Sequence, residues 1–519
     1  MEVISPLVTD FHTVQPPSLI EINNSNDTRN DETIYYEPLN YIYKAEDVQL
    51  YNKGGYHPVQ LGATLNNRYK VVHKLGNGGF GLVWLCRDTF LDKWRAVKIL
   101  TADQSAKGTE EMVIRDLSRR CTAAELERNH ILLPLEQFWL VGPNGRHRCF
   151  VMPVLGWTVS KWRLMQKDYE EQTHIDTRDI CRQVIESAHF LHKHGICHGD
   201  FRPGNILMKL EGIDNLSEDE LLTLMGEPVC LEVETASGQP GTPRAPDYCV
   251  APANESWPQY LSTKSIAVID FGESFSIVSP PRTTGIPDAY APPEVLLEGF
   301  GDLGTHSDIW SLACTLFEVR TGSPLVGGNF GGITDSLGEM EYYLGPLPSR
   351  YQTSHDTTHC GIPSESPSIS WGPEVQLGIG YLAPEEQLEI DAPENDYFKE
   401  ARAEIMESSG YRDVFEAVLG QEHTLYQLVD TAKEPKVIKY RYPKADVLGL
   451  ADLLRRMLKY DPEDRISMDA VMSHHWVRKM RKGNRGGKLR PSNERLPIAL
   501  MASTVTIFLV YQLGKKAML

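Results

Sequence analysis

A short segment, residues 196–207 (ICHGDFRPGNIL), places several chemically useful residues at fixed offsets inside an apolar frame. Asp200 can accept a proton or bind a cation, and Asn205 offers an amide oxygen. Arg202 carries a permanent charge with several donors, which suits the binding of a phosphate group. The simpler interpretation is a polar loop between two buried segments, and this stretch alone does not exclude it.

A glycine-rich turn lies nearer the N-terminus, where residues 76–81 read GNGGFG between two strand-like segments. Glycines at these positions let backbone amides approach phosphates, because no Cβ stands in the way. Similar spacing occurs where a strand opens a dinucleotide-binding helix. Residues 82–86 resume a strand pattern here, and this favours a phosphate lid between two strands.

Lys98 interrupts an apolar strand-like run, RAVKIL, and a buried ammonium group needs a partner. The next helical segment offers two acids, Glu110 and Glu111. Glu110 precedes apolar residues at helical spacing, whereas the offsets of Glu111 lead to polar ones. We therefore predict a Lys98–Glu110 pair, with an ordinary solvated glutamate as the alternative.

Two further segments extend the pattern. Residues 149–156 (CFVMPVLG) form a short apolar run that bends at Pro153 and suits a hinge, although a plain buried strand is the alternative. Residues 266–272 (IAVIDFG) place Asp270 after an apolar strand. Residues 210–264 are rich in Pro, Gly, Ser and acids, so we predict a largely flexible insertion with a short helix at 218–225.

The glycine turn, the lysine strand, the 196–207 loop and the Asp-Phe-Gly segment resemble, in this order, the signatures of eukaryotic-type serine/threonine protein kinases. The resemblance implies an α+β bilobal fold with a small β-rich N-lobe, a larger helical C-lobe and two insertions. Three features are similar to the SR-protein kinase family, which phosphorylates arginine/serine-rich splicing factors. They are the segment 51–59 (YNKGGYHPV), the split kinase domain and the SDIWSLAC helix from residue 307.

The resemblance implies ATP and Mg²⁺ as cofactors. Asp200 would accept the hydroxyl proton, assisted by Arg202, while Asn205 and Asp270 would hold magnesium. Lys98, held by Glu110, would orient the α and β phosphates. The nucleotide-binding positions that the resemblance implies are Leu75, Gly76, Asn77, Gly78, Gly81, Val83, Ala96, Lys98, Glu110, Met152, Val154 and Leu155.

The same resemblance implies two supporting roles outside the chemistry. Asp308 would anchor the backbone of the 196–207 loop. Glu294 would form a buried structural pair with Arg465, and breaking one side of such a pair costs several kcal/mol.

Three positions depart from the kinase pattern. Gly199 stands where many kinases have Arg, so no cation of this loop awaits a phosphorylated activation segment. We therefore predict activity that does not need such phosphorylation. Arg202 replaces Lys, which alters its reach, and Pro287 stands about where a Thr would help to seat the substrate.

Charge and cysteine content narrow the class of protein. The formal net charge of −18 argues against direct nucleic-acid binding and favours basic protein partners or simple solubility. Nine cysteines without a Cys-x-x-Cys pair fit a reducing compartment, with no disulfide framework and no structural metal. We expect a cytoplasmic or nuclear protein, or both, acting on a basic or Arg/Ser-rich substrate.

We divide the chain by composition and motif. No secretory signal is expected, because Met1 to Ile20 has early acids and no long apolar run. The expected parts are a disordered tail at 1–47, an N-lobe at 48–153, a C-lobe at 154–477 with insertions near 210–264 and 327–440, and a basic segment with an apolar tail at 478–519.

Two segments allow more than one interpretation. Acidic runs at 385–389 and 392–396 in the second insertion could dock an Arg-rich substrate, although a solvated surface is the more common role of such runs. Residues 496–513 carry no charge and lie at the length threshold of a membrane-spanning helix. A membrane anchor and a tail docking on the kinase both stay open.

Two other functions remain as alternatives. A pseudokinase scaffold would keep the fold and the nucleotide site with little phosphotransfer, and the three departures favour it. The retention of every metal and phosphate residue opposes it. A small-molecule phosphotransferase is less compatible with the segment from Asp270 to Glu294, and the sequence leaves the oligomeric state open.

Overall fold

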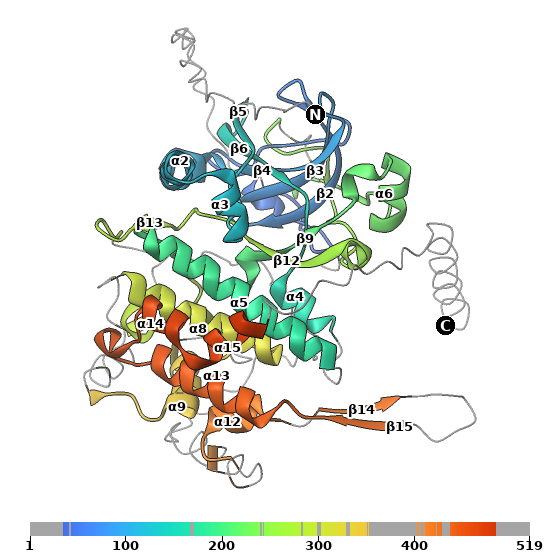
Figure 1. Ribbon diagram of the computed structural model, residues 1–519. Helices are drawn as coiled ribbons and strands as arrows, with labels where there is room; N and C mark the ends of the chain where they lie inside the picture. Colours follow the sequence, from blue (N-terminus) through green and yellow to red (C-terminus); the bar gives the residue numbers. More distant parts are fainter. Residues whose placement is uncertain are drawn as a thin grey trace, which may run out of the picture.

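The computed structural model has two lobes, one built on a β-sheet and the other on helices (Figure 1). This arrangement confirms the predicted bilobal α+β fold. The structure describes residues 35–483 with the exception of 41–42, 167–170, 239–240, 242, 282–283, 298–302, 328–332, 350, 352–401, 404–406, 408–410, 422 and 428–435.

The N-lobe is built on one six-stranded antiparallel sheet with the order β1-β2-β3-β4-β6-β5. Side chains alternate between its two faces. Trp84 and Val97 are paired in register and belong to the hydrophobic cluster on the outer face, while the next pair, Val83 and Lys98, faces the other way. The strands are β1 (Thr64–Leu65), β2 (Tyr69–Gly78), β3 (Gly81–Asp88), β4 (Lys93–Leu100), β5 (Glu136–Gly142) and β6 (Gly145–Pro153).

Three helices follow β4 beside this sheet. Gly108 adopts φ +69° and separates the first two, because a left-handed residue ends one helix and redirects the chain. The second helix buries Val113, Ile114 and Leu117 on one face, as their spacing predicts. The helices are α1 (Ala102–Lys107), α2 (Thr109–Arg120) and α3 (Ala123–Arg128).

Two segments, the described residues of 35–59 and of 229–251, cover the outer face of the sheet, although we expected disorder up to residue 47 and flexibility in the insertion. Tyr36 bridges Thr235, and residues 48–59 pack with Val250 against the sheet. We call the described residues of 35–59 and 229–251 the N-lobe cap. Within its insertion, strands β10 (Cys230–Glu232) and β11 (Tyr248–Val250) pair, and α6 (Glu218–Met225) forms where the sequence predicted a short helix.

The predicted disorder up to residue 47 is therefore wrong for the part that the structure describes, and so is the predicted flexibility of residues 210–264. The cap buries individual apolar residues against a sheet that other segments of the chain form. It therefore needs neither the alternating nor the helical spacing by which sequence patterns are recognised. Residues 1–34 lie outside the described residues.

The C-lobe packs around α8, which buries residues along nearly its whole length. Two small sheets, β12-β9-β7 and β13-β8, lie at the boundary with the N-lobe. The helices are α4 (Val159–Leu164), α5 (Glu171–Lys193), α7 (Pro293–Leu297), α8 (Thr305–Thr321), α9 (Ile333–Leu344), α12 (Val414–Leu419), α13 (Lys444–Met457), α14 (Met468–Ser473) and α15 (His475–Gly483). The strands are β7 (Leu155–Thr158), β8 (Ile196–Cys197), β9 (Ile206–Leu210), β12 (Ser262–Val268), β13 (Phe275–Ser276), β14 (His423–Gln427) and β15 (Lys436–Tyr440).

Several expectations fall on residues outside those that the structure describes. These are the acidic runs at 385–389 and 392–396 and the apolar tail at 496–513. No helix in the described part of the chain combines the length and apolar character needed to cross a bilayer.

Candidate active site

The loop that follows β8 is held by an aspartate of α8. Asp308 accepts hydrogen bonds from the backbone N–H groups of His198 (2.7 Å) and Gly199 (3.0 Å), and its carboxylate lies 3.0 Å from His192 Nε2. Burial alone would raise the pKa of Asp308, but the histidines and these N–H groups hold it below its usual value. The ionised carboxylate fixes the loop backbone, which confirms the predicted anchoring role.

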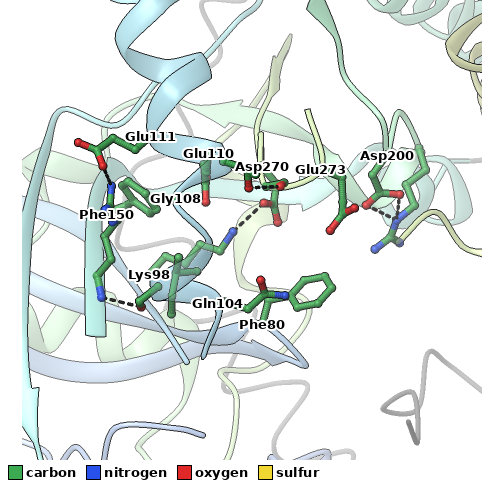
Figure 2. Close-up of a pocket in the computed structure, with 16 residues that line it drawn as sticks. Phe80, Lys98, Gln104, Gly108, Glu110, Glu111, Phe150, Asp200, Asp270 and Glu273 are labelled. Carbon is green, nitrogen blue, oxygen red and sulfur yellow. Dashed lines mark hydrogen bonds and ion pairs between the residues drawn. The ribbon is translucent and has the colours of Figure 1, made fainter. Parts of the chain in front are cut away.

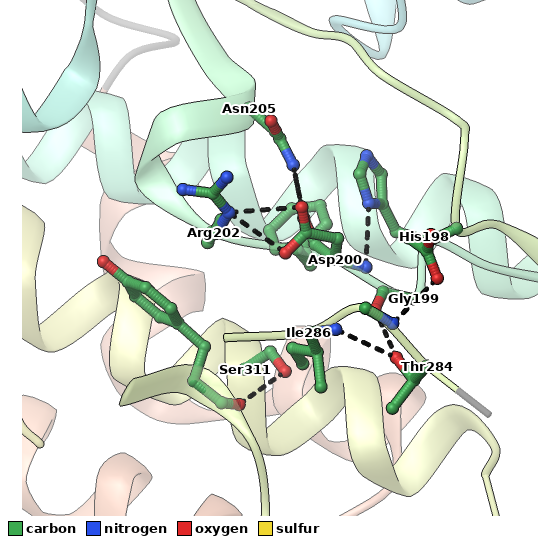
Figure 3. A network of polar contacts seen from close by, with 12 residues as sticks. His198, Gly199, Asp200, Arg202, Asn205, Thr284, Ile286 and Ser311 are labelled. Carbon is green, nitrogen blue, oxygen red and sulfur yellow. Dashed lines mark hydrogen bonds and ion pairs between the residues drawn. The ribbon is translucent and has the colours of Figure 1, made fainter. Parts of the chain in front are cut away.

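Two neighbours orient the Asp200 carboxylate (Figure 3). Arg202 Nε donates to Asp200 Oδ1 and Oδ2 at 3.0 and 3.1 Å. Asn205, at the end of a 3-10 turn (Pro203–Asn205), donates from Nδ2 to Asp200 Oδ2 (2.7 Å) and to its backbone carbonyl (2.9 Å). The predicted base, cation and amide therefore form one hydrogen-bonded group.

Asp270, two residues after the end of β12, lines the same pocket as Asp200 and Arg202. Its carboxylate Oδ1 lies 2.8 Å from Lys98 Nζ, so the pair connects the N-lobe sheet to the strand that precedes the activation segment (Figure 2). Burial disfavours the charged form of both side chains, but the attraction between the two charges outweighs it. Asp270 raises the pKa of Lys98, and Lys98 lowers the pKa of Asp270. Lys98 and Asp270 are both ionised at neutral pH.

The predicted direct pair between Lys98 and Glu110 is not formed; Lys98 instead takes Asp270 as its ion-pair partner. Glu110 lines the same pocket and accepts a hydrogen bond from the Phe271 backbone. Burial raises the pKa of Glu110 to about 7, against the attraction of Lys98. The sequence could not reveal this choice, because the competing carboxylate comes from another lobe.

The neighbouring acid, Glu111, has a structural role. Its carboxylate forms ion pairs with Arg148 of β6 and with Arg115 one helical turn away. Thr109 Oγ1 also donates to the Gly272 carbonyl at 2.9 Å. These contacts hold the first turn of α2 against both the sheet and the Asp-Phe-Gly segment.

The glycine-rich turn connects β2 and β3, with Gly78 opposite Gly81 in the ladder. A Cβ on Gly76, Gly78 or Gly79 would meet no atom within 4 Å, so packing does not require glycine there. A Cβ on Gly81 would instead lie 2.3 Å from the Ile99 carbonyl oxygen. The open glycines leave room beside the turn, as a bound phosphate chain requires.

The remaining predicted nucleotide positions lie on adjacent strands. Leu75 and Asn77 belong to β2 and Val83 to β3, next to the β4 residues Ala96 and Lys98. Ala96 is opposite Met152 of β6, and the chain then passes through Val154 into Leu155, where β7 begins. Their roles toward a nucleotide base stay predictions.

One pocket brings together Lys98, Glu110, Asp200, Arg202 and Asp270 (Figure 2). Asn205 joins them through its bonds to Asp200. The sequence analysis missed other residues that line this pocket, since neither aromatic residues nor isolated charges there have a distinctive spacing. They include Phe80, Gln104, Thr109, Arg148 and Glu273.

The donor set fits a magnesium ion. Mg²⁺ prefers oxygen ligands, usually one or two carboxylates together with substrate phosphates. Asp270 supplies a carboxylate, and Asn205 uses its amide nitrogen for Asp200, which leaves its amide oxygen for a cation. The predicted metal ligands are therefore of the right chemical type.

The position that departs from the kinase pattern, Gly199, has a steric explanation. Gly199 adopts φ +76°, and a Cβ there would lie 2.2 Å from the backbone carbonyl oxygen of Glu273. The Glu273 side chain in turn accepts from the Gly285 N–H at 2.9 Å. Loop 196–207 and the start of the activation segment therefore pack without space for any side chain at 199.

The end of the activation segment is fixed by the expected buried pair. Arg465 Nη1 and Nη2 each donate to a Glu294 carboxylate oxygen at 2.6 Å. This bidentate geometry confirms the predicted pair and attaches α7 to the C-lobe core.

Comparison with known proteins is consistent with this geometry. The protein kinase domain family matches residues 69–217. Human SRSF protein kinase 3 is 36% identical over 166 residues, which are 31% of this chain and 29% of that protein. The Physarum polycephalum serine/threonine-protein kinase SRPK is 25% identical over 84% of this chain and 92% of its own length. A solved kinase domain covers 81% of this chain and 98% of its own, at 18% identity and a TM-score of 0.49.

The likeness to the mammalian and nematode relatives is confined to one part of each protein, because the chain spans less than a third of their length. Within the part that matches lie the glycine turn, Lys98 and the 196–207 loop. Residues 69–217 therefore match the protein kinase domain family, and the relatives named here, SRSF protein kinase 3 and SRPK, are similar to this chain over the shares given above.

Proposed function

We propose that this chain is an ATP-dependent serine/threonine protein kinase. The observation that carries the proposal is the Lys98–Asp270 pair at 2.8 Å in a pocket that Asp200 also lines. These groups come from β4, from just after β12 and from the loop after β8. Groups so distant along the chain converge where a triphosphate and its cations could be bound together.

Each residue has one role in this proposal. When bound, ATP supplies the γ-phosphoryl group and Mg²⁺ neutralises charge on the phosphates. Lys98 orients the phosphate chain, while Asp270 and Asn205 hold the cation. Asp200 accepts the hydroxyl proton of the Ser or Thr, and Arg202 beside it offsets charge that develops in transfer.

We further propose a basic or Arg/Ser-rich protein as substrate. Two observations support this class: the names of the relatives, SRSF protein kinase and SRPK, and the net charge of −18. A cytoplasmic or nuclear location suits such a substrate. Anchoring through residues 496–513 is a separate proposal, which cell fractionation with and without residues 496–519 tests.

Activity is expected without phosphorylation of the activation segment. Gly199 offers no cation to a phosphate group, and α2 is already attached through Thr109 and Glu111. Phosphatase treatment of the purified protein should leave its rate unchanged. A large gain in rate after phosphorylation of residues 273–291 would contradict this expectation.

The test uses labelled ATP and two peptides of equal length, one with Arg-Ser repeats and one with Arg-Ala repeats. Magnesium-dependent labelling of the first alone is expected, and it should disappear in Asp270→Asn. Nucleotide-dependent thermal stabilisation is measured in parallel. Stabilisation without labelling of any protein substrate would contradict the kinase proposal and identify a nucleotide-binding scaffold.

A further inference from the structure

The glycine-rich turn receives a hydrogen bond from outside the strands that form it. Tyr56, in the N-lobe cap, donates its hydroxyl to the backbone carbonyl oxygen of Gly78 at 2.9 Å. The Tyr56 side chain is buried, and burial raises its pKa, so the hydroxyl keeps its proton at every physiological pH. This donor is therefore permanent.

A buried polar chain holds Tyr56 and the strand beneath it. The rings of Tyr56 and Tyr51 pack edge to face, with their centroids 5.6 Å apart. The Tyr51 hydroxyl donates to Glu46 Oε1 at 2.7 Å. Glu46 forms a fully buried ion pair with Lys74 of β2, whose ammonium group lies over the Trp84 ring of β3. Both strands of the turn are thus fixed from the cap.

The direction of this contact matters because of peptide geometry. Tyr56 packs in the same cluster as Trp84 and Ile99, on the sheet face opposite Lys98. The C=O and N–H of a planar trans peptide point in opposite directions, and the described residues contain no cis peptide. A hydroxyl that holds the Gly78 carbonyl from the outer face leaves the Gly79 N–H directed to the other face, which carries Lys98.

We propose that Tyr56 is a positioning residue for phosphate binding. Its hydroxyl sets the Gly78–Gly79 peptide so that the Gly79 N–H is presented to the phosphate chain of the nucleotide before the nucleotide arrives. This inference rests on the proposed function, since it concerns the same ATP site. It adds that the cap, and not the turn alone, determines affinity for the phosphates.

The decisive variant is Tyr56→Phe, which removes one hydroxyl and keeps the ring. The matched control is Tyr69→Phe, because Tyr69 is also a buried tyrosine of this lobe, but its hydroxyl donates to Glu136 at 2.8 Å. Loss of one neutral hydrogen bond typically weakens an interaction by about two- to tenfold. We expect Tyr56→Phe to weaken Mg-ATP binding within that range and Tyr69→Phe to leave it unchanged.

A second readout separates positioning from general loosening of the fold. Adenosine has no phosphates, so its affinity should be equal in wild type and Tyr56→Phe, whereas KM for ATP should rise more than kcat falls. Equal weakening for adenosine and ATP, or unchanged ATP binding in Tyr56→Phe, overturns the inference.

The outcomes also distinguish this inference from the proposed function. If wild type binds Mg-ATP without transferring phosphate, and Tyr56→Phe binds it more weakly than wild type, the kinase proposal fails and the positioning role stands. If wild type phosphorylates its substrate and Tyr56→Phe binds Mg-ATP equally well, only the positioning role fails.

Discussion

Two lysines on strands of the same sheet, β2 and β4 on either side of β3, show how differently one side-chain type is used in this protein. Lys74 of β2 is paired with Glu46 on the outer face, and their side chains are 0% and 1% exposed. Lys98 of β4 is paired with Asp270 on the inner face, where the exposed fractions are 13% and 29%. The first pair is sealed by the cap, and the second borders a pocket.

The difference teaches how to separate structural charges from functional ones. The buried Lys74–Glu46 pair has no room for another partner, so the interaction can only attach the cap to the sheet. A pair beside a pocket can exchange partners, and Lys98 can move its charge toward phosphates while Asp270 takes a cation. Both lysines interrupt apolar strands, so a lysine within a strand is not by itself a sign of catalysis.

The largest effect is expected for Lys98→Met. Loss of the ammonium group removes the charge that orients the phosphates, so kcat/KM should fall by roughly a hundredfold or more. Thermal unfolding should show that the variant stays folded, because the Lys98 site is partly open to solvent. Turnover like that of the wild type would show that the inner lysine, too, is only structural.

Lys74→Met should instead lower the stability of the protein. It leaves the Glu46 carboxylate buried without its partner, which typically costs about 3–5 kcal/mol of unfolding free energy. Denaturant unfolding of the variant measures this loss. The double variant Glu46→Gln/Lys74→Met is the control, since removing both charges should restore much of the stability. A Lys74→Met variant of wild-type stability would mean that the cap is not held by this pair.

The same comparison explains what could be predicted from the sequence. Asp200 and Asn205 were recognisable because they lie at an offset that one motif fixes. Asp308 was recognisable only through the resemblance to protein kinases, since its backbone partners lie 110 and 109 residues away. The Lys74–Glu46 pair spans 28 residues without any repeating spacing. Nothing in residues 43–47 marks them as ordered, because their order comes from a sheet face formed elsewhere in the chain.

The partner of Lys98 shows a second limit of sequence reasoning. Helical periodicity favoured Glu110 over Glu111 as the partner of Lys98, but both acids line the pocket and Lys98 pairs with Asp270. Which carboxylate reaches the ammonium group depends on how the two lobes meet, and this is set by contacts such as Thr109 with Gly272. Local patterns therefore identified the groups of the site but not all of their pairings.

A third prediction compares two glycines, one from each lobe. Gly199 and Gly62 have nearly equal backbone angles, φ +76° and +78°, but a Cβ at 62 would meet no atom within 4 Å. Alanine in this conformation costs roughly 1–2 kcal/mol at either site. Gly199→Ala must also displace the Glu273 carbonyl, so it should lose more stability than Gly62→Ala and show a lower kcat. Equal losses and equal rates in the two variants would remove the steric explanation for Gly199.

The smallest effect concerns His57 of the cap and appears only in acid. Burial lowers the pKa of His57 from 6.5 to about 4, and the charge of His147 adds to this effect. The ring centroids of the two histidines lie 4.9 Å apart. Between these values the unfolded chain binds a proton that the folded chain does not, so stability falls as the pH drops from 6.5 towards 4. Above pH 6.5 both states are neutral at this site, and the contribution disappears.

His57→Gln should therefore reduce the slope of Tm against pH between 6.5 and 4 compared with wild type, while a substitution of the exposed residue, His475→Gln, should not. Equal slopes in wild type and His57→Gln would show that His57 is protonated without loss of the cap. A reduced slope would instead mean that acid weakens the cap through residue 57. Because Tyr56 precedes His57 and bonds to the glycine-rich turn, ATP affinity should then decline over the same pH range in wild type more than in His57→Gln.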